Sequence, residues 1–205
     1  MQKNQKQVWD DIAEEWHEFK QNPSKNVIKF LENKKGKILD IGSGSGRHLL
    51  EVNKENKEFY LTDFSEKMIE FAKKRAEELG IKNKTHFEVS EADSLPYKNN
   101  FFDAIICIAT LHCLQTEEKR LNAISEIYRV LKPGSETLIE VWNKNSDRFK
   151  NAPKEKYIAW RDKGQRYYYL YEREEILEQF RKKGFEIKEE LEHRVNISFV
   201  VKKPD

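Results

Sequence analysis

Apolar positions along the chain follow two different periodicities. Short apolar or alternating runs bounded by turn residues predict strands. Seven runs of this kind occur, at residues 37–41, 59–62, 85–89, 103–108, 137–142, 185–191 and 195–201. Apolar residues three or four positions apart predict helices within residues 8–16, 24–31, 49–52, 65–79, 116–131 and 173–183. Helices and strands therefore alternate along most of the chain.

This order predicts a doubly wound α/β fold. We expect a mostly parallel, seven-stranded sheet with helices on both faces, and an antiparallel C-terminal hairpin because the last two runs are joined by a short connection. Right-handed crossovers place the loops after the first four strands at one edge, where ligands bind in such sheets. We expect a single domain over residues 1–205, with an N-terminal helical lid (1–35) and an insert (143–171).

Composition limits the class of protein and its expected cellular location. Charged residues make up 36% of the chain, and no apolar run approaches the roughly 18 residues of a membrane span. The first six residues are polar and lack the apolar stretch of a signal peptide. Cys107 and Cys113 lack metal-ligand spacing, so we expect free thiols, no metal site and a cytoplasmic location.

Positive charge is concentrated in the insert. Residues 144–166 carry eight basic and three acidic side chains, whereas the whole chain has a net charge of only +2. Basic residues interleaved with Trp160 and with the tyrosines at 167–169 suit contacts to phosphates and stacking on unpaired RNA bases. Alternating tyrosines equally suit an ordinary edge strand. Both interpretations are open at this point.

A glycine-rich turn follows the first predicted strand. It reads Asp40-Ile41-Gly42-Ser43-Gly44-Ser45-Gly46, and its glycines allow a tight turn and a close approach of a ligand to the backbone. A nicotinamide fingerprint needs Gly or Ala where Arg47 stands, so the pattern argues against that cofactor. The turn alone is also compatible with a plain strand-to-helix connection.

Acidic residues follow the next strands in a recognisable order. Asp63 ends the second strand, where a carboxylate can bind both ribose hydroxyls, and Asp93 follows the third strand within Glu-Ala-Asp-Ser-Leu-Pro. Together with Asp40 and the glycines, this series resembles the class I S-adenosylmethionine-dependent methyltransferases. The resemblance implies S-adenosylmethionine as cofactor, with Asp40 near its methionine end and Asp93 near the adenine amine. The expected cofactor-binding residues are Asp40, Gly42, Gly44, Gly46, Asp63, Asp93 and Ser94.

A narrower resemblance covers almost the whole chain. Residues 8–13, 42–49, 108–112 and 165–171 are similar to segments of the tRNA wobble-uridine carboxymethyl methyltransferases. The most specific segment is Gln-Arg-Tyr-Tyr-Tyr-Leu-Tyr at 165–171, preceded by Trp160 as in that family. The resemblance implies methylation of the carboxylate of a carboxymethyl-type modified wobble uridine, in the anticodon loop of tRNA. It also implies a small zinc-binding activator protein as a possible partner.

The expected chemistry needs alignment more than proton transfer. A carboxyl group has a pKa near ~4 and is already an ionised nucleophile at neutral pH. We expect Arg166 and Arg194 to clamp the anion and His112 to line the approach to the methyl group. The remaining substrate-binding candidates are Lys20, Tyr167, Tyr169 and Asn196.

Other functions remain open from the sequence. Lys20, Ser24 and Cys113 depart from the family pattern near its substrate site, which leaves room for a different nucleoside. The fold also serves many metabolites, so a small-molecule methyltransferase is an alternative. A third possibility is a non-catalytic, cofactor-binding partner subunit.

Overall fold

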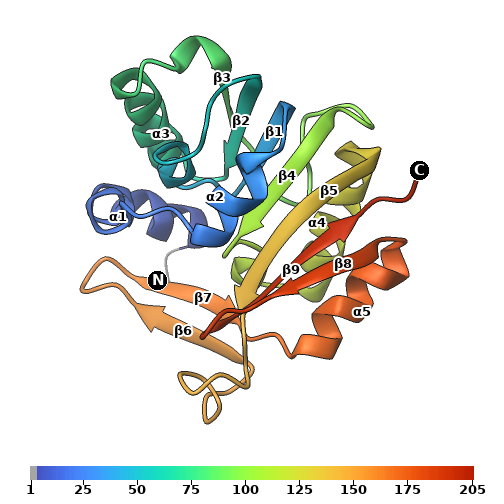
Figure 1. Cartoon of the computed structure of the whole chain (residues 1–205). Helices are drawn as coiled ribbons and strands as arrows, with labels where there is room; N and C mark the ends of the chain where they lie inside the picture. Colours follow the sequence, from blue (N-terminus) through green and yellow to red (C-terminus); the bar gives the residue numbers. More distant parts are fainter. Residues whose placement is uncertain (1–3) are drawn as a thin grey trace.

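A seven-stranded sheet forms the centre of the computed structural model, which describes residues 4–205 (Figure 1). The first three residues of the expected lid lie outside this range. The parallel part contains β1 (Gly36–Ile41), β2 (Lys57–Asp63), β3 (Thr85–Val89), β4 (Phe102–Ile108) and β5 (Leu131–Trp142). The strand order is β3-β2-β1-β4-β5-β9-β8, in which β9 (Asn196–Lys202) runs antiparallel to both β5 and β8 (Glu186–Leu191). The expected sheet and its antiparallel C-terminal hairpin are confirmed.

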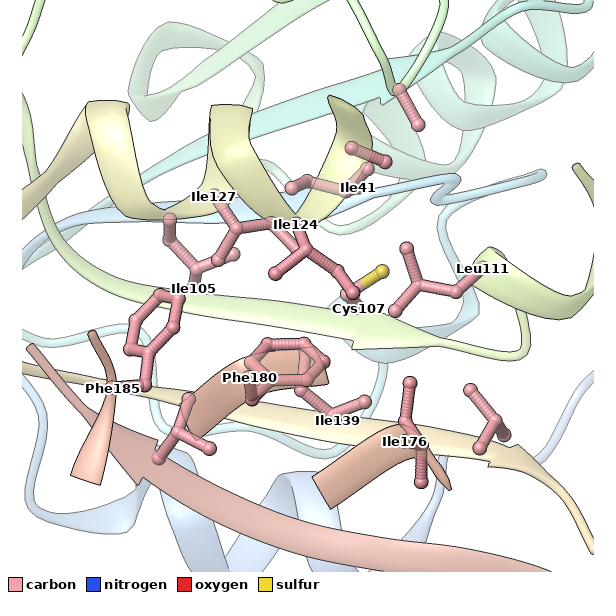
Figure 2. Close-up of a cluster of buried hydrophobic side chains, with 14 of the residues drawn as sticks. Ile41, Ile105, Cys107, Leu111, Ile124, Ile127, Ile139, Ile176, Phe180 and Phe185 are labelled. Atoms are coloured by element: carbon pink, nitrogen blue, oxygen red, sulfur yellow. The ribbon is translucent and has the colours of Figure 1, made fainter. Parts of the chain in front are cut away.

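Helices cover both faces of this sheet. On one face, α2 (Lys25–Glu32) and α3 (Glu66–Glu78) bury Val27, Leu31 and Ala72 against the strands. On the other face lie α4 (Glu117–Val130) and α5 (Arg173–Lys183). Figure 2 shows Ile124 of α4 above Cys107 of β4, in the same cluster as Phe180 of α5. The doubly wound arrangement follows from these two separate cores.

Local capping fixes where these helices begin and end. Ser65 Oγ accepts a hydrogen bond from the Met68 amide (3.1 Å) at the start of α3, and Thr116 caps α4 in the same way. Gly184, with φ 103°, ends α5 in the left-handed conformation that glycine adopts without strain. The ends of these three helices lie within one residue of the ranges predicted from the sequence.

The helix expected after the glycine-rich turn does not form. Residues 47–49 make a single 3₁₀ turn instead, directly after Gly46 in a left-handed conformation (φ 73°). Leu49 and Val52 are buried in the core all the same, beneath α3. A polar turn then leads to β2: Asn53 Oδ1 accepts from the Glu55 amide, and Asn56 has φ 54°. The apolar spacing thus reflects burial of a short loop rather than a helix face.

The lid and the insert pack against each other. The lid helix α1 (Gln5–Phe19) contacts α3 and the hairpin made by β6 (Glu155–Ala159) and β7 (Gln165–Tyr169), which is orange in Figure 1. Gln5 accepts from the Tyr167 amide (2.8 Å), and Trp160 Nε1 donates to Glu15 (2.6 Å). These contacts hold the hairpin beside the helix that borders the candidate site.

Among residues 4–205, no helix combines the length and the apolar content that crossing a bilayer requires.

Candidate functional site

A cavity of about 360 Å³ lies at the carboxyl ends of β1, β2 and β4. Its walls come from the glycine-rich turn, from Asp63, from the loop after β3 and from Trp9 and Trp16 of α1. The volume lies within the range of small-molecule sites, and the position is the one at which doubly wound sheets bind ligands.

The three glycines of the turn all have left-handed backbones, but they serve different purposes. A Cβ on Gly42 would lie 2.1 Å from Thr110 Oγ1, which itself donates to the Ile41 carbonyl (3.0 Å). Gly44 faces the cavity, where Trp16 Nε1, 3.7 Å away, is the nearest atom that a Cβ would meet. Gly46 packs behind the turn, against Ala72 and Leu61. Gly42 therefore allows two loops to interlock, and Gly44 leaves bare backbone facing a ligand.

Asp63 presents a carboxylate to the same cavity. Its two oxygens accept from the Gly44 and Ser65 amides at 2.9 Å each, so the side chain is fixed in position. Burial raises the pKa of this carboxyl to about 6. Each oxygen retains a further lone pair, which suits paired hydroxyl donors such as those of a ribose.

Cofactor affinity should depend on the ionisation of Asp63. Protonation turns one carboxylate oxygen of Asp63 into a donor. Because the pKa of this group is about 6, cofactor affinity should fall as the pH drops below that value. Calorimetric titration with S-adenosylhomocysteine between pH 5 and 8 measures this. Asp63→Ala should bind at least about tenfold more weakly at pH 8 and lose the pH dependence. A wild-type affinity that stays constant across this range would contradict the assignment.

Asp40 is buried behind the turn and is not among the residues that line the cavity. Its Oδ2 lies 3.0 Å from Nδ1 of His48, and His48 does line the cavity. The sequence assigned no role to His48, which lies within the 42–49 segment that resembles the family and just before residues 49–52, where a helix was expected. The loop after β3 contributes Ser90, Glu91 and Ala92, whereas Asp93 lies 3.9 Å from Lys119 and Ser94 is exposed outside the lining.

A second, more open groove of about 570 Å³ adjoins the first cavity. The two share Lys20, Arg47, Ile108 and Ala109 at their junction. The groove brings together three of the sequence-predicted residues, Lys20, Arg194 and Asn196. It is also lined by Trp142, with the Arg148 guanidinium 5.2 Å from the indole ring.

Four cations surround this junction: Lys20 and Arg47 line both cavities, Arg148 lines only the groove, and Arg166 lies behind, in the lining of neither. Burial lowers the pKa of Lys20, and the positive charges of Arg47, Arg148 and Arg166 lower it further. Within residues 4–205, none of these four side chains forms an ion pair. The carboxylates whose fields reach Arg47 are engaged elsewhere: Asp40 with His48, and Glu140 with the donors Ser24, Asn26 and Ser198. An anion would therefore be stabilised at this point.

Arg166 is the most buried of the four, with 6% of its surface exposed. Its guanidinium lies 4.8 Å from the ring of Trp160 and 5.4 Å from that of Trp16, and Nη1 donates to Tyr168 Oη (2.7 Å). Its buried Nε has no hydrogen-bond partner among the described residues. Aromatic faces thus hold this charge in place while donor capacity remains free.

His112 is not brought to either cavity. It is 1% exposed, its ring stacks on Trp142, and its Nδ1 accepts from the Trp142 amide (3.0 Å). Burial lowers the pKa of this imidazole to about 3, so it is neutral at physiological pH. In this arrangement His112 supports the Trp142 wall of the groove.

Tyr167 and Tyr169 also point away from the groove. Both are buried in the core formed with α4 and α5, and the Arg120 guanidinium lies 3.8 Å from the Tyr169 ring. Part of the insert's positive charge is compensated, because Lys154 pairs with Glu175 and Lys163 with Glu15. In the described part of the chain, no group of His, Cys, Asp and Glu side chains is arranged to hold a metal ion.

Comparison with known proteins identifies the family of the chain. Residues 32–184 match the model of a family described as a methyltransferase domain. A mouse relative named tRNA (carboxymethyluridine(34)-5-O)-methyltransferase ALKBH8 is 31% identical over 163 residues, which cover 77% of this chain and 22% of the relative. The chain thus spans about a fifth of the length of that curated relative.

Two solved structures show the same fold. A SAM-dependent methyltransferase from Methanosarcina mazei superposes with a TM-score of 0.73 at 22% identity, covering 89% of this chain and 99% of that one. A chain from the complex between the Haloferax volcanii Trm112 methyltransferase activator and a methyltransferase gives 0.75 at 15% identity, covering 98% and 96%. The chain therefore belongs to the methyltransferase-domain family, with the class I fold and the S-adenosylmethionine dependence that its sequence motifs predict.

Proposed function

We propose that the chain transfers a methyl group from S-adenosylmethionine to the carboxylate of a carboxymethyl-type modified wobble uridine in tRNA. The observation that carries this proposal is the group of cations around the junction: Lys20 and Arg47 line both cavities, Arg148 lines the groove, and the charge of Arg166, which lines neither, acts on Lys20. The name of the mouse relative supports the same substrate class.

The first cavity fits S-adenosylmethionine. Gly44 offers bare backbone that a Cβ would obstruct, Asp63 offers acceptors for ribose hydroxyls, and His48 has a buried ring nitrogen without a described partner. When bound, this cofactor supplies an electrophilic methyl group on a positively charged sulfur. The protein then has to bring a nucleophile to that side of the cavity.

The junction suits an anionic acceptor. The positive charges of Arg47, Arg148 and Arg166 act on the partly buried Lys20, and a carboxylate beside Lys20 would offset that repulsion. A neutral acceptor would leave it in place, so the charge favours an anionic acceptor, and the name of the mouse relative is what favours tRNA over a small molecule. Because a carboxylate is already ionised at neutral pH, holding it in line with the methyl group is the main requirement.

Some of the remaining residues would bind the carboxylate, and others would bind the nucleoside. Arg166 has a planar fork suited to a carboxylate, and Lys20 adds a second charge at the junction. Arg194 and Asn196 would hold the nucleoside and its flanking backbone along the groove. Trp142, whose ring already stacks on His112, Phe149 and Tyr168, would serve as a rigid wall of the groove beside Arg148. His112, Tyr167 and Tyr169 would act from behind, as supports of these walls.

A small zinc-binding activator remains part of the proposal. The Haloferax volcanii methyltransferase of the same fold is complexed with the Trm112 methyltransferase activator. Activity assays of this chain therefore include a parallel reaction with a protein of that class.

The test is the chemical identity of the methylated nucleoside. The protein is incubated with methyl-labelled cofactor and tRNA that carries the unesterified carboxymethyl group, and the nucleosides are analysed by mass spectrometry. We expect the label as a base-labile ester at the wobble uridine. Label confined to a ring nitrogen, to ribose or to a free metabolite would exclude the carboxylate as the acceptor.

Binding of tRNA should depend on the groove and on salt. The double variant Arg148→Ala/Arg194→Ala should bind tRNA about 10- to 100-fold more weakly, with a salt dependence of log K reduced by about 1.5, because two phosphate contacts are lost. Arg181→Ala/Lys182→Ala removes the same charge from the end of α5 and serves as the matched control. Equal losses in both double variants would mean that binding is not centred on the groove.

A further inference from the structure

A buried pair of side chains lies beneath the glycine-rich turn. Asp40 Oδ2 and His48 Nδ1 are 3.0 Å apart, and both side chains are only 6% exposed. Asp40 is the second-to-last residue of β1, whereas His48 lies in the 3₁₀ turn at residues 47–49, where the chain was expected to enter a helix. The two positions are brought together only because the chain folds back at once after Gly46.

This pair fixes the tautomer of the imidazole. A carboxylate only accepts hydrogen bonds, so the Nδ1 of His48 carries the proton that bonds to Asp40. In the neutral ring, Nε2 is then an acceptor. No described residue donates to Nε2, and none donates to the second Asp40 oxygen, although both atoms are buried. A buried polar atom without a partner is costly, so a ligand that donates here would be favoured.

Only one member of the pair lines the cavity. His48 lines it together with Ser43, Gly44, Ser45 and Arg47, whereas Asp40 does not. We propose that His48 Nε2 accepts a hydrogen bond from the α-ammonium at the methionine end of S-adenosylmethionine, and that Asp40 is a positioning residue that acts through His48.

This assignment deepens the role that the resemblance gave to Asp40. It rests on the cofactor half of the proposed function and is independent of the methyl acceptor. The ribose would lie toward Asp63, whose oxygens are held by the Gly44 and Ser65 amides, so the two acidic residues would act on separate parts of the cofactor. His48 thereby becomes a residue that distinguishes ligands with an amino-acid end from those without one.

Calorimetry with two ligands tests the proposal without any turnover. S-Adenosylhomocysteine carries the α-ammonium, and 5′-methylthioadenosine lacks the amino-acid end. His48→Ala should weaken binding of the first by about 10- to 150-fold, the range for a hydrogen bond to a charged group, and change the second by less than about twofold. Asp40→Asn removes the charge that holds the proton on Nδ1, and it should produce a similarly selective loss.

Rescue and coupling separate positioning from a structural role. His48→Gln offers a carbonyl acceptor and should recover binding of S-adenosylhomocysteine to within about fivefold of wild type. The double variant Asp40→Asn/His48→Ala should be no weaker than His48→Ala alone, because Asp40 acts through the missing ring. His86→Ala, an exposed histidine on β3 paired with Glu58, is the matched control.

Two results would overturn this inference. One is an equal loss of affinity for both ligands in folded His48→Ala and Asp40→Asn. The other is additive losses in the double variant, which would make the two residues independent. A wild-type protein that binds neither ligand would instead overturn the cofactor half of the proposed function.

Discussion

Replacing Arg166 with methionine is expected to slow methyl transfer to tRNA by about 100- to 1000-fold, the cost of removing one donor aimed at the reacting anion. Methionine fills the space between Trp16, Trp160 and Tyr168 without supplying charge or a donor. Arg166 is absent from the lining of the cofactor cavity, so affinity for S-adenosylhomocysteine should stay within about threefold. Single-turnover rates and calorimetry on the same preparations measure the two quantities.

A conservative variant separates charge from shape. Arg166→Lys keeps the positive charge but lacks the planar fork, so its rate should fall between those of wild type and Arg166→Met. If cofactor affinity fell as much as the transfer rate in Arg166→Met, the residue would be supporting the lid rather than holding the acceptor.

Gly42→Ala is expected to abolish measurable cofactor binding and to destabilise the fold by about 2–5 kcal/mol. A left-handed backbone at a residue with a Cβ costs roughly 1–2 kcal/mol, and forcing extra atoms into a packed site costs about 1–3 kcal/mol. The new Cβ would lie 2.1 Å from Thr110 Oγ1, so the loops after β1 and β4 must separate at the cavity wall. Denaturant unfolding and calorimetry report the two effects.

Gly80 provides the matched control for this variant. Its φ of +67° is close to the +65° of Gly42, but a Cβ there would meet nothing within 4 Å. Gly80→Ala should therefore show only the backbone cost of about 1–2 kcal/mol and bind cofactor normally. If the two alanine variants were equally stable, the contact with Thr110 would not be what requires glycine at position 42.

Much of the fold follows from local patterns. The runs at 103–108 and 137–142 are apolar because β4 and β5 are covered on both faces, and Ser65 and Thr116 cap helices by donor–acceptor chemistry that needs no tertiary context. Asp63 could be predicted to face the cavity because it ends the second strand, and the carboxyl ends of the parallel strands form the ligand-binding edge in this architecture.

The faces of the insert could not be predicted in the same way. Alternation at residues 166–169 predicts a strand, yet both of its faces are buried: Arg166 and Tyr168 face the lid side, and Tyr167 and Tyr169 face the core. Which face meets the site depends on how the hairpin docks against α1, a contact between segments about 160 residues apart in sequence. The choice of tyrosines for base stacking rested on the pattern alone, whereas the ring that lines the groove is Trp142.

Residue 48 was missed for a related reason. Leu49 and Val52 have helical spacing, so the segment after the turn predicted a helix whose polar positions face solvent. The 3₁₀ turn reverses that expectation, because it carries His48 inward to Asp40. A change of a few backbone angles after Gly46 thus separates a surface position from a cavity wall.

The placement of the tryptophans gives the protein an optical readout of its own ligands. The chain has four: Trp9 and Trp16 line the cofactor cavity, Trp142 lines the groove, and the Trp160 ring lies 5.5 Å from that of Trp16. Indole emission responds to nearby charge and to stacked rings, so intrinsic fluorescence should follow cofactor and tRNA binding without a dye. Trp142→Phe would keep the fluorescence change on cofactor binding and remove the part that reports on the groove. Comparing this variant with wild type would therefore separate cofactor binding from tRNA binding.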